Sequence, residues 1–75
     1  MSGSAAILTL ATALVAAHAR GETTRLVDLY TVAADGTAPE AAAFYLTHAY
    51  VFALEAGDPR AEALHARLVA EGREE

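Results

Sequence analysis

The 75-residue sequence contains no cysteine, no tryptophan and no lysine. Without cysteine the chain can form no disulfide, no thiolate metal site and no cysteine nucleophile. Five arginines stand against ten acidic residues, which gives a formal net charge of −5. That charge argues against nucleic acid and against an anionic membrane as partners. The use of arginine without lysine suggests a GC-rich bacterial genome, an inference from codon usage alone.

Motifs that carry chemistry are also missing. The sequence has no GxxxxGK[ST] and no GxGxxG pattern, so it offers no cradle for nucleotide phosphates. Serine occurs only at Ser2 and Ser4, which leaves no credible Ser-His-Asp arrangement. Asp28 and Asp35 would lie about 10 Å apart along one helix face, as a solvated pair. We therefore expect no catalytic residue, no cofactor-binding residue, no cofactor and no enzymatic activity.

Charge is absent from Ser2 to Ala19, and Ala17-His18-Ala19 has the small-x-small form of a signal-peptide cleavage site. The residues before the apolar run include no lysine or arginine, which a signal peptide carries there. The run itself is shorter than the roughly 20 residues that a bilayer-spanning helix needs. We therefore predict that residues 5–20 fold as a helix of a cytoplasmic protein.

Twenty alanines dominate the composition. Alanine is the best helix former, but it buries little apolar area, so its helices must approach closely. Glycines typical of helix ends divide the chain at Gly21, Gly36, Gly57 and Gly72. Asp58 followed by Pro59 is typical of an N-cap and a first helical position. We predict an all-α single domain over residues 1–75, with helices near 5–20, 23–35, 38–56 and 59–71.

A shift of 36 residues superimposes the glycine pattern on itself, pairing Gly21 with Gly57 and Gly36 with Gly72. A period in this range is typical of repeated helical hairpins. The four predicted helices should therefore form an array of two hairpins. Helices 23–35 and 59–71 have one apolar face each, whereas residues 38–56 are apolar all round. The latter helix is predicted to be central and buried on every side.

Residues 44–72 read FYLTHAYVFALEAGDPRAEALHARLVAEG. In the first helix of this segment Tyr45 is a large residue, Ala49 a small one and Phe52 an aromatic one. In its second helix, Ala61 is an alanine. In these residues the segment resembles a degenerate tetratricopeptide-type hairpin, although His65 and Leu68 replace the usual small-large pairing. The resemblance implies a protein-interaction scaffold without catalytic residues. The segment also resembles short, functionally unassigned helical proteins of GC-rich bacteria, which implies no known activity.

Three histidines, His18, His48 and His65, are the candidates for metal or general-base chemistry. They fall on three predicted helices and could converge as a three-histidine zinc site. No pair has HxxxH spacing, so we expect structural histidines and no metal ligand. The alternative function that these residues leave open is a small ligand- or metal-binding regulator built on the His48/Tyr45/Glu55 edge.

The leading functional prediction is a non-enzymatic protein-interaction module. The first helix carries no charge before Arg20, and its small-residue face can approach another helix closely. The predicted interface residues are Thr9, Thr12, Ala13 and Ala16. Two-fold pairing is the commonest use of such a patch. We therefore expect a homodimer or a complex with another protein chain, without nucleic acid or membrane partners.

Overall fold

A computed structural model describes the backbone of residues 2–72 and the side chains of residues 9–72. It contains four helices, α1 (Ser2–Arg20), α2 (Thr23–Asp35), α3 (Pro39–Ala56) and α4 (Arg60–Ala70), and no strand among the described residues. The all-α prediction is confirmed. The first helix begins three residues before its predicted start, and the other boundaries agree to within one residue.

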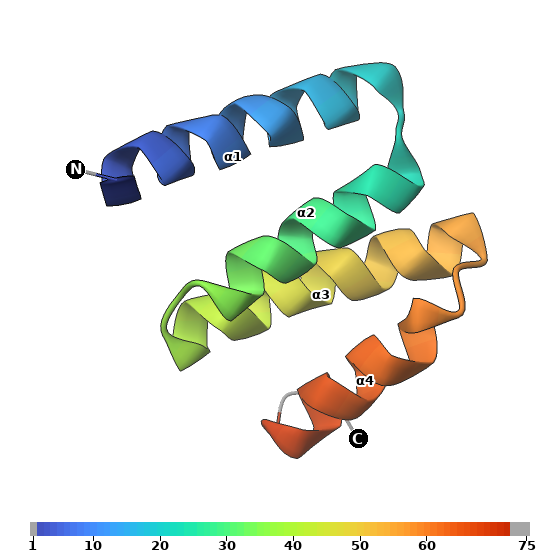
Figure 1. Ribbon diagram of the computed structural model, residues 1–75. Coiled ribbons are helices and arrows are strands. Elements are labelled where there is room, and N and C mark those ends of the chain that lie inside the picture. Colours follow the sequence, from blue (N-terminus) through green and yellow to red (C-terminus); the bar gives the residue numbers. More distant parts are fainter. Residues whose placement is uncertain (1, 73–75) are drawn as a thin grey trace.

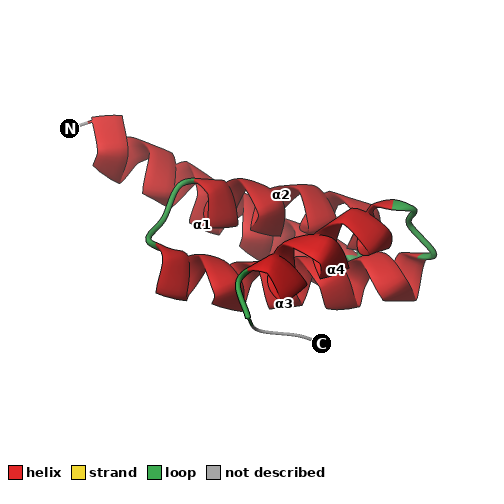
Figure 2. Cartoon of the chain, turned by 90° about the horizontal axis from the view of Figure 1, so that it is seen from below, coloured by secondary structure: helices red, strands yellow, loops and turns green. Residues whose placement is uncertain are grey.

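The helices form a flat array in chain order (Figure 1). Within residues 2–72, α1 packs on α2, α2 on α3 and α3 on α4, while α1 and α4 each pack along one neighbour. The Cα positions span 37 × 27 × 13 Å. The N-terminal end of α1 extends beyond the other helices (Figure 2). This arrangement agrees with two successive helical hairpins.

The turns after α1 and α3 have the same geometry. Gly21 and Gly57 both have φ of 65°, a left-handed conformation that strains any residue with a Cβ. The residue after each glycine donates its backbone N–H to a carbonyl five residues back, Glu22 to Ala17 at 3.0 Å and Asp58 to Ala53 at 2.8 Å. Both alanines are fully buried. The 36-residue repeat is therefore present at these two turns.

The repeat does not extend through the helices that follow. Gly36 ends α2 with φ of −100°, so it does not share the left-handed conformation of Gly21 and Gly57. A shift of 36 residues from the buried Val27 reaches Ala63, which is exposed, whereas α4 buries Leu64 and Leu68. The resemblance to a tetratricopeptide hairpin stays a prediction.

Asp58 caps α4 as predicted. Its carboxylate accepts the backbone N–H of Arg60 at 2.9 Å, and Pro59 between them has helical φ of −61°. This bond satisfies one of the N–H groups that have no partner within the helix. The start of α4 is thus fixed immediately after the turn from α3.

The core is thin and rich in alanine. Its buried side chains are Ala17, Leu26, Val27, Ala33, Ala34, Ala42, Ala43, Leu46, Ala49, Ala53, Leu64 and Leu68. Seven of these twelve are alanines, which lets the helices approach one another closely but buries little area per residue. The large side chains that are fully buried are Leu46, Leu68 and Val27.

The prediction that α3 is buried all round is wrong. Its inner side, formed by Ala42, Leu46, Ala49 and Ala53, is buried, but its outer side is not. Phe44, Val51 and Leu54 are 60%, 45% and 57% exposed. The reason is that α3 has two neighbours, α2 and α4, in a single layer. No helix of residues 2–72 covers the remaining side.

Candidate interaction surfaces

The four residues predicted to form an interface lie together on α1. Thr9, Thr12, Ala13 and Ala16 line one shallow depression of about 410 Å³. Thr9 and Thr12 are exposed, and both alanines are half-buried. Their side chains are small, so this surface offers close approach and little apolar area. The structure thus brings the four predicted residues together, and their role as an interface stays a prediction.

The largest exposed apolar side chains lie mostly elsewhere. Among residues 9–72, six such side chains are at least 42% exposed: Val15, Val32, Phe44, Val51, Leu54 and Val69. Three of them are on α3 and one is on α4. Within the same residues five large apolar side chains are buried, two on α2, one on α3 and two on α4. Scattered exposed apolar residues are normal, but a row of them on one helix indicates an interaction site.

We call Phe44, Thr47, Val51 and Leu54 the outer ridge of α3. Successive members are three, four and three residues apart, which aligns them along one side of the helix. The Thr47 hydroxyl donates to the Ala43 carbonyl of the same helix at 2.9 Å. The hydroxyl hydrogen of Thr47 is therefore used within α3. The outer ridge is an apolar stripe of about three helical turns.

An aromatic cluster joins the first three helices beside this ridge. His18 of α1 bonds through Nε2 to the Tyr30 hydroxyl of α2 at 2.9 Å, and its ring meets Phe52 of α3 edge-on at 5.6 Å. Tyr30 stacks on His48 at 5.0 Å and on Phe52 at 5.8 Å. Burial raises the pKa of the Tyr30 phenol, and neighbouring Tyr45 raises it further. The cluster holds α1 against the rest of the array.

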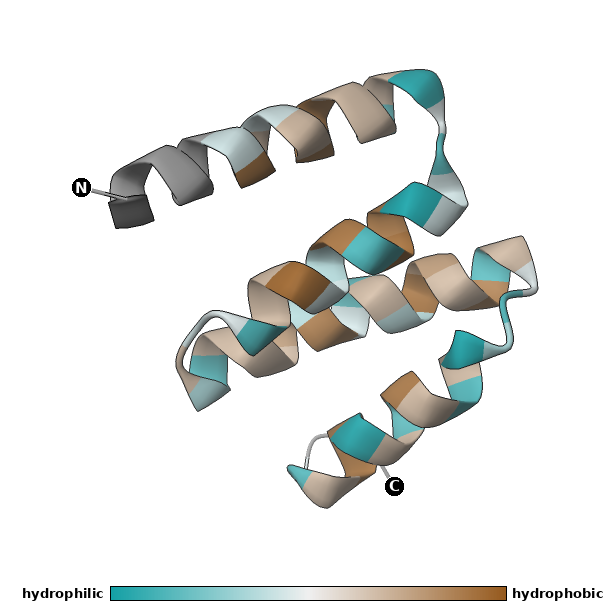
Figure 3. Ribbon diagram, in the orientation of Figure 1, coloured by the Kyte–Doolittle hydropathy of each residue, from teal (hydrophilic) through white to brown (hydrophobic). Residues whose placement is uncertain are grey.

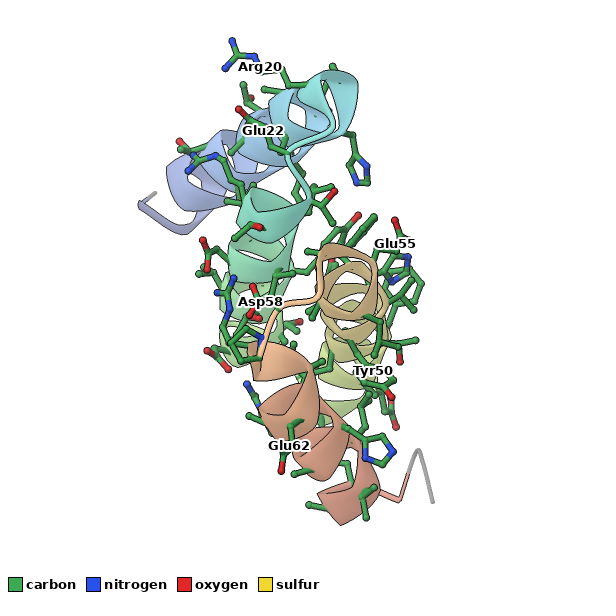
Figure 4. All side chains as sticks on the ribbon, turned by 90° about the vertical axis from the view of Figure 1, so that its right-hand side faces the viewer. Arg20, Glu22, Tyr50, Glu55, Asp58 and Glu62 are labelled. Carbon is green, nitrogen blue, oxygen red and sulfur yellow. The ribbon has the colours of Figure 1, made fainter. Side chains whose placement is uncertain are left out.

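The His48/Tyr45/Glu55 edge is partly assembled. Tyr45 and His48 both contact Tyr30, with ring centroids 6.3 and 5.0 Å away. A carbonyl oxygen only accepts, so His48 Nδ1 must donate in its 2.9 Å bond to the Phe44 carbonyl. Glu55 is exposed near the end of α3 (Figure 4). Within residues 9–72 it makes no hydrogen bond or ion pair with either of the other two.

The three histidines do not converge. His18 and His48 both contact Tyr30, whereas His65 of α4 packs on Tyr50 at 5.4 Å. Among the described residues no group of three side chains is placed to hold a metal ion. In the structure these histidines form hydrogen bonds and pack against aromatic rings.

On the other side of the layer, a groove of about 500 Å³ runs between α2 and α4. Two ion pairs cross it, one from Arg60 to Asp28 and one from Arg67 to Asp35 at 2.9 Å. Arg60 also binds the Asp58 carboxylate, which is its main partner and raises the Arg60 pKa. The same contact lowers the Asp58 pKa. Because both crossing pairs are largely exposed, they contribute modestly to stability.

The two sides of the layer differ in chemistry. In Figure 4, Asp58 lies towards α2, while Tyr50 and Glu55 lie on the side of α3. The α2–α4 groove is lined by Asp28, Thr31, Val32, Arg60, Ala63, Leu64 and Arg67. Its charges are paired with one another, whereas the outer ridge of α3 carries none. The ridge is therefore the more apolar of the two surfaces.

Comparison with known protein families, with curated proteins and with solved structures finds no match for this chain. None of the helices within residues 2–72 combines the length and the hydropathy needed to cross a bilayer. The geometry of the exposed surfaces is thus the basis for a functional proposal.

The sequence contained a signal for the outer ridge that its overall hydropathy obscured. Phe44, Thr47, Val51 and Leu54 follow the three-four spacing of a helix-packing stripe. The apolar residues all round the helix predict a central position, in which this stripe would be part of the core. Only the position of the neighbouring helices distinguishes the two cases.

Proposed function

We propose that this chain is a non-enzymatic protein-interaction module that works by burying apolar helix surface against another protein chain. The observation that supports the proposal most is that, among residues 9–72, six large apolar side chains are exposed and five are buried. A folded monomer gains stability by burying such side chains, and about 25 cal/mol is lost for each Å² of apolar surface left in water. Covering this surface with another chain would recover part of that free energy.

The partner proposed first is a second copy of the chain. Small domains with thin cores commonly gain stability from oligomerisation, and closed two-fold dimers are the commonest form. This chain has no disulfide to take that role, since it has no cysteine. The net charge of −5 continues to disfavour nucleic acid as a partner.

The proposal is tested by light scattering behind size exclusion, on the wild type over a range of concentrations and on Ala13→Glu. We expect a dimer that forms at high concentration. Loss of the dimer in Ala13→Glu would place the interface on α1, where Thr9, Thr12, Ala13 and Ala16 lie. A wild type that stays monomeric throughout would contradict the self-association form of the proposal.

A further inference from the structure

We propose that the outer ridge of α3 is the self-association surface, on which the same ridge of a second copy packs antiparallel. The inference rests on the proposed function and deepens it by naming the surface, the partner and the orientation. The surface is formed by Phe44, Thr47, Val51 and Leu54.

The spacing of the ridge matches what paired helices use. Residues that alternate three and four apart form the contact stripe of a coiled coil, in which each side chain fits between four of the partner helix. Phe44 and Leu54 are more than half exposed, and Val51 nearly so. Because the stripe lies on one helix face, a two-fold axis brings it into contact with the same stripe of a second copy.

Charge favours the antiparallel orientation. His48 and Glu55 are seven residues apart on one flank of the ridge, with His48 towards the start of the helix and Glu55 towards its end. In a parallel two-fold pair this flank would lie on opposite sides of the contact in the two copies, so His48 and Glu55 of one copy would face neither residue of the other. An antiparallel pair sets the His48 end of one helix against the Glu55 end of the other. The contact between His48 and Glu55 then forms twice and has no counterpart in the parallel pair, so the antiparallel pair is preferred.

Helix α4 extends the same surface. Its packing beside α3 places His65 on Tyr50, and the exposed Val69 follows His65 one turn later on the same side of α4. The partner helix would therefore contact α3 and the edge of α4 together. Val15 and Val32 are also exposed and lie on α1 and α2, and among residues 9–72 neither is part of a row of exposed large side chains.

The size of the surface indicates a weak dimer. The broad face of the array measures 37 × 27 Å, or about 1,000 Å² in projection. Because the outer ridge and the edge of α4 occupy only part of that face, each partner would bury less than the ~800 Å² of a standard interface. We therefore expect a dissociation constant in the micromolar range, on the order of 10 to 100 μM.

The closing experiment compares two matched variants by sedimentation equilibrium, with circular dichroism to verify folding. Val51→Glu introduces a charge on the outer ridge, and Val32→Glu introduces the same charge at an exposed valine of α2. We expect Val51→Glu to weaken the dimer at least about tenfold, and Val32→Glu and Ala13→Glu to leave it within about twofold. A dimer that survives Val51→Glu overturns the α3 surface but leaves the proposed function standing. A monomeric wild type overturns both.

The orientation is tested by disulfide trapping, which the absence of native cysteine makes unambiguous. Phe44→Cys and Leu54→Cys are prepared separately, mixed and oxidised. We expect a mixed disulfide between the two variants, because opposite ends of the ridge meet in an antiparallel pair. Disulfides formed efficiently within each variant alone, without the mixed product, would indicate a parallel pair and overturn the proposal.

Discussion

The two sides of α3 differ in a way that hydropathy does not explain. The inner side consists of Ala42, Leu46, Ala49 and Ala53, none more than 7% exposed. The outer side carries Phe44, Val51 and Leu54, each of which is larger than the three alanines of the inner side, and all are at least 45% exposed. Apolar residues occur on both sides of the helix (Figure 3). The helix is thus divided by side-chain size and by neighbours, rather than by polarity.

This contrast shows what a flat array does with an apolar helix. Small residues on the inner side let α2 and α3 pack closely, because alanine keeps the helix backbones near one another. Large residues on the outer side meet no helix of the described chain. Burial in such an array depends on how many neighbours a helix has, and α3 has two.

The largest expected effect is on the inner side. Leu46 is fully buried, so Leu46→Ala removes core contacts and should destabilise the chain by about 2–5 kcal/mol. Leu54→Ala makes the same change on the outer side of the same helix. It should alter the stability of the monomer by less than about 1 kcal/mol. The two variants are compared by urea unfolding at dilute concentration, and equal losses would contradict the assigned sides.

Enlarging a small side chain, instead of shortening a large one, also distinguishes the two sides of α3. Ala49 is fully buried on the inner side, so Ala49→Leu overpacks the contact and should destabilise by about 1–3 kcal/mol. Ala41→Leu, at an exposed position of α3, is the matched control and should change stability by less than about 0.5 kcal/mol. Thermal unfolding measures both variants. A stable Ala49→Leu variant would mean that the helices do not pack closely there.

A smaller effect is expected at the start of α4, the helix that packs beside α3. Asp58→Ala removes the N-cap and should lower the melting temperature by roughly 5 °C. Asp35→Ala removes one exposed ion pair to α4 and should change the melting temperature by less than about 2 °C. An unchanged melting temperature in Asp58→Ala would show that the bond to the Arg60 backbone does not stabilise the helix.

The same residue gives a pH dependence with a defined sign. The bonds to Arg60 hold the Asp58 pKa below its ordinary value of 3.8 in the folded chain. The stabilisation is therefore complete above pH 3.8 and is lost as the pH falls through the lower folded-state pKa. Asp58→Asn should make acid unfolding less steep in this window. An acid transition of the same steepness in both proteins would contradict the assignment.

Metal ions are expected to have no effect on stability. Zinc at stoichiometric concentration should not change the melting temperature, because His65 packs apart from the His18 and His48 cluster. Calorimetric titration should likewise give no saturable heat. If zinc raised the melting temperature and His48→Ala abolished that rise, the result would instead support a ligand- or metal-binding site at His48, Tyr45 and Glu55.

The sequence predicted the fold well where local chemistry determines structure. Gly21 and Gly57 ended their helices in the left-handed conformation, and Asp58 with Pro59 started α4. These features act over a few residues, so they can be recognised without knowing the neighbours. The order of the helices follows from the short turns between them.

The sequence failed where burial depends on tertiary packing. The helical spacing of Leu26, Leu29, Tyr30 and Ala33 predicts one apolar stripe on α2, yet Val27 and Ala34, which lie beside it, are also core residues. The apolar residues all round α3 predict that Phe44 and Val51 lie in the core, which is wrong. Hydropathy alone does not reveal whether a helix has two neighbours or four. The surface on α3 could therefore be located only after the array was known.

Pairing through the outer ridge of α3 is tested by a dilution series monitored by methyl NMR. Val51 and Leu54 lie on the outer ridge of α3, whereas Val15 and Val32 are exposed on other helices. If the ridge pairs with a second copy, the methyl signals of Val51 and Leu54 will shift or broaden as concentration rises. Those of Val15 and Val32 will stay constant. Concentration-dependent shifts at Val15 or Val32, with none at Val51 and Leu54, would contradict the account.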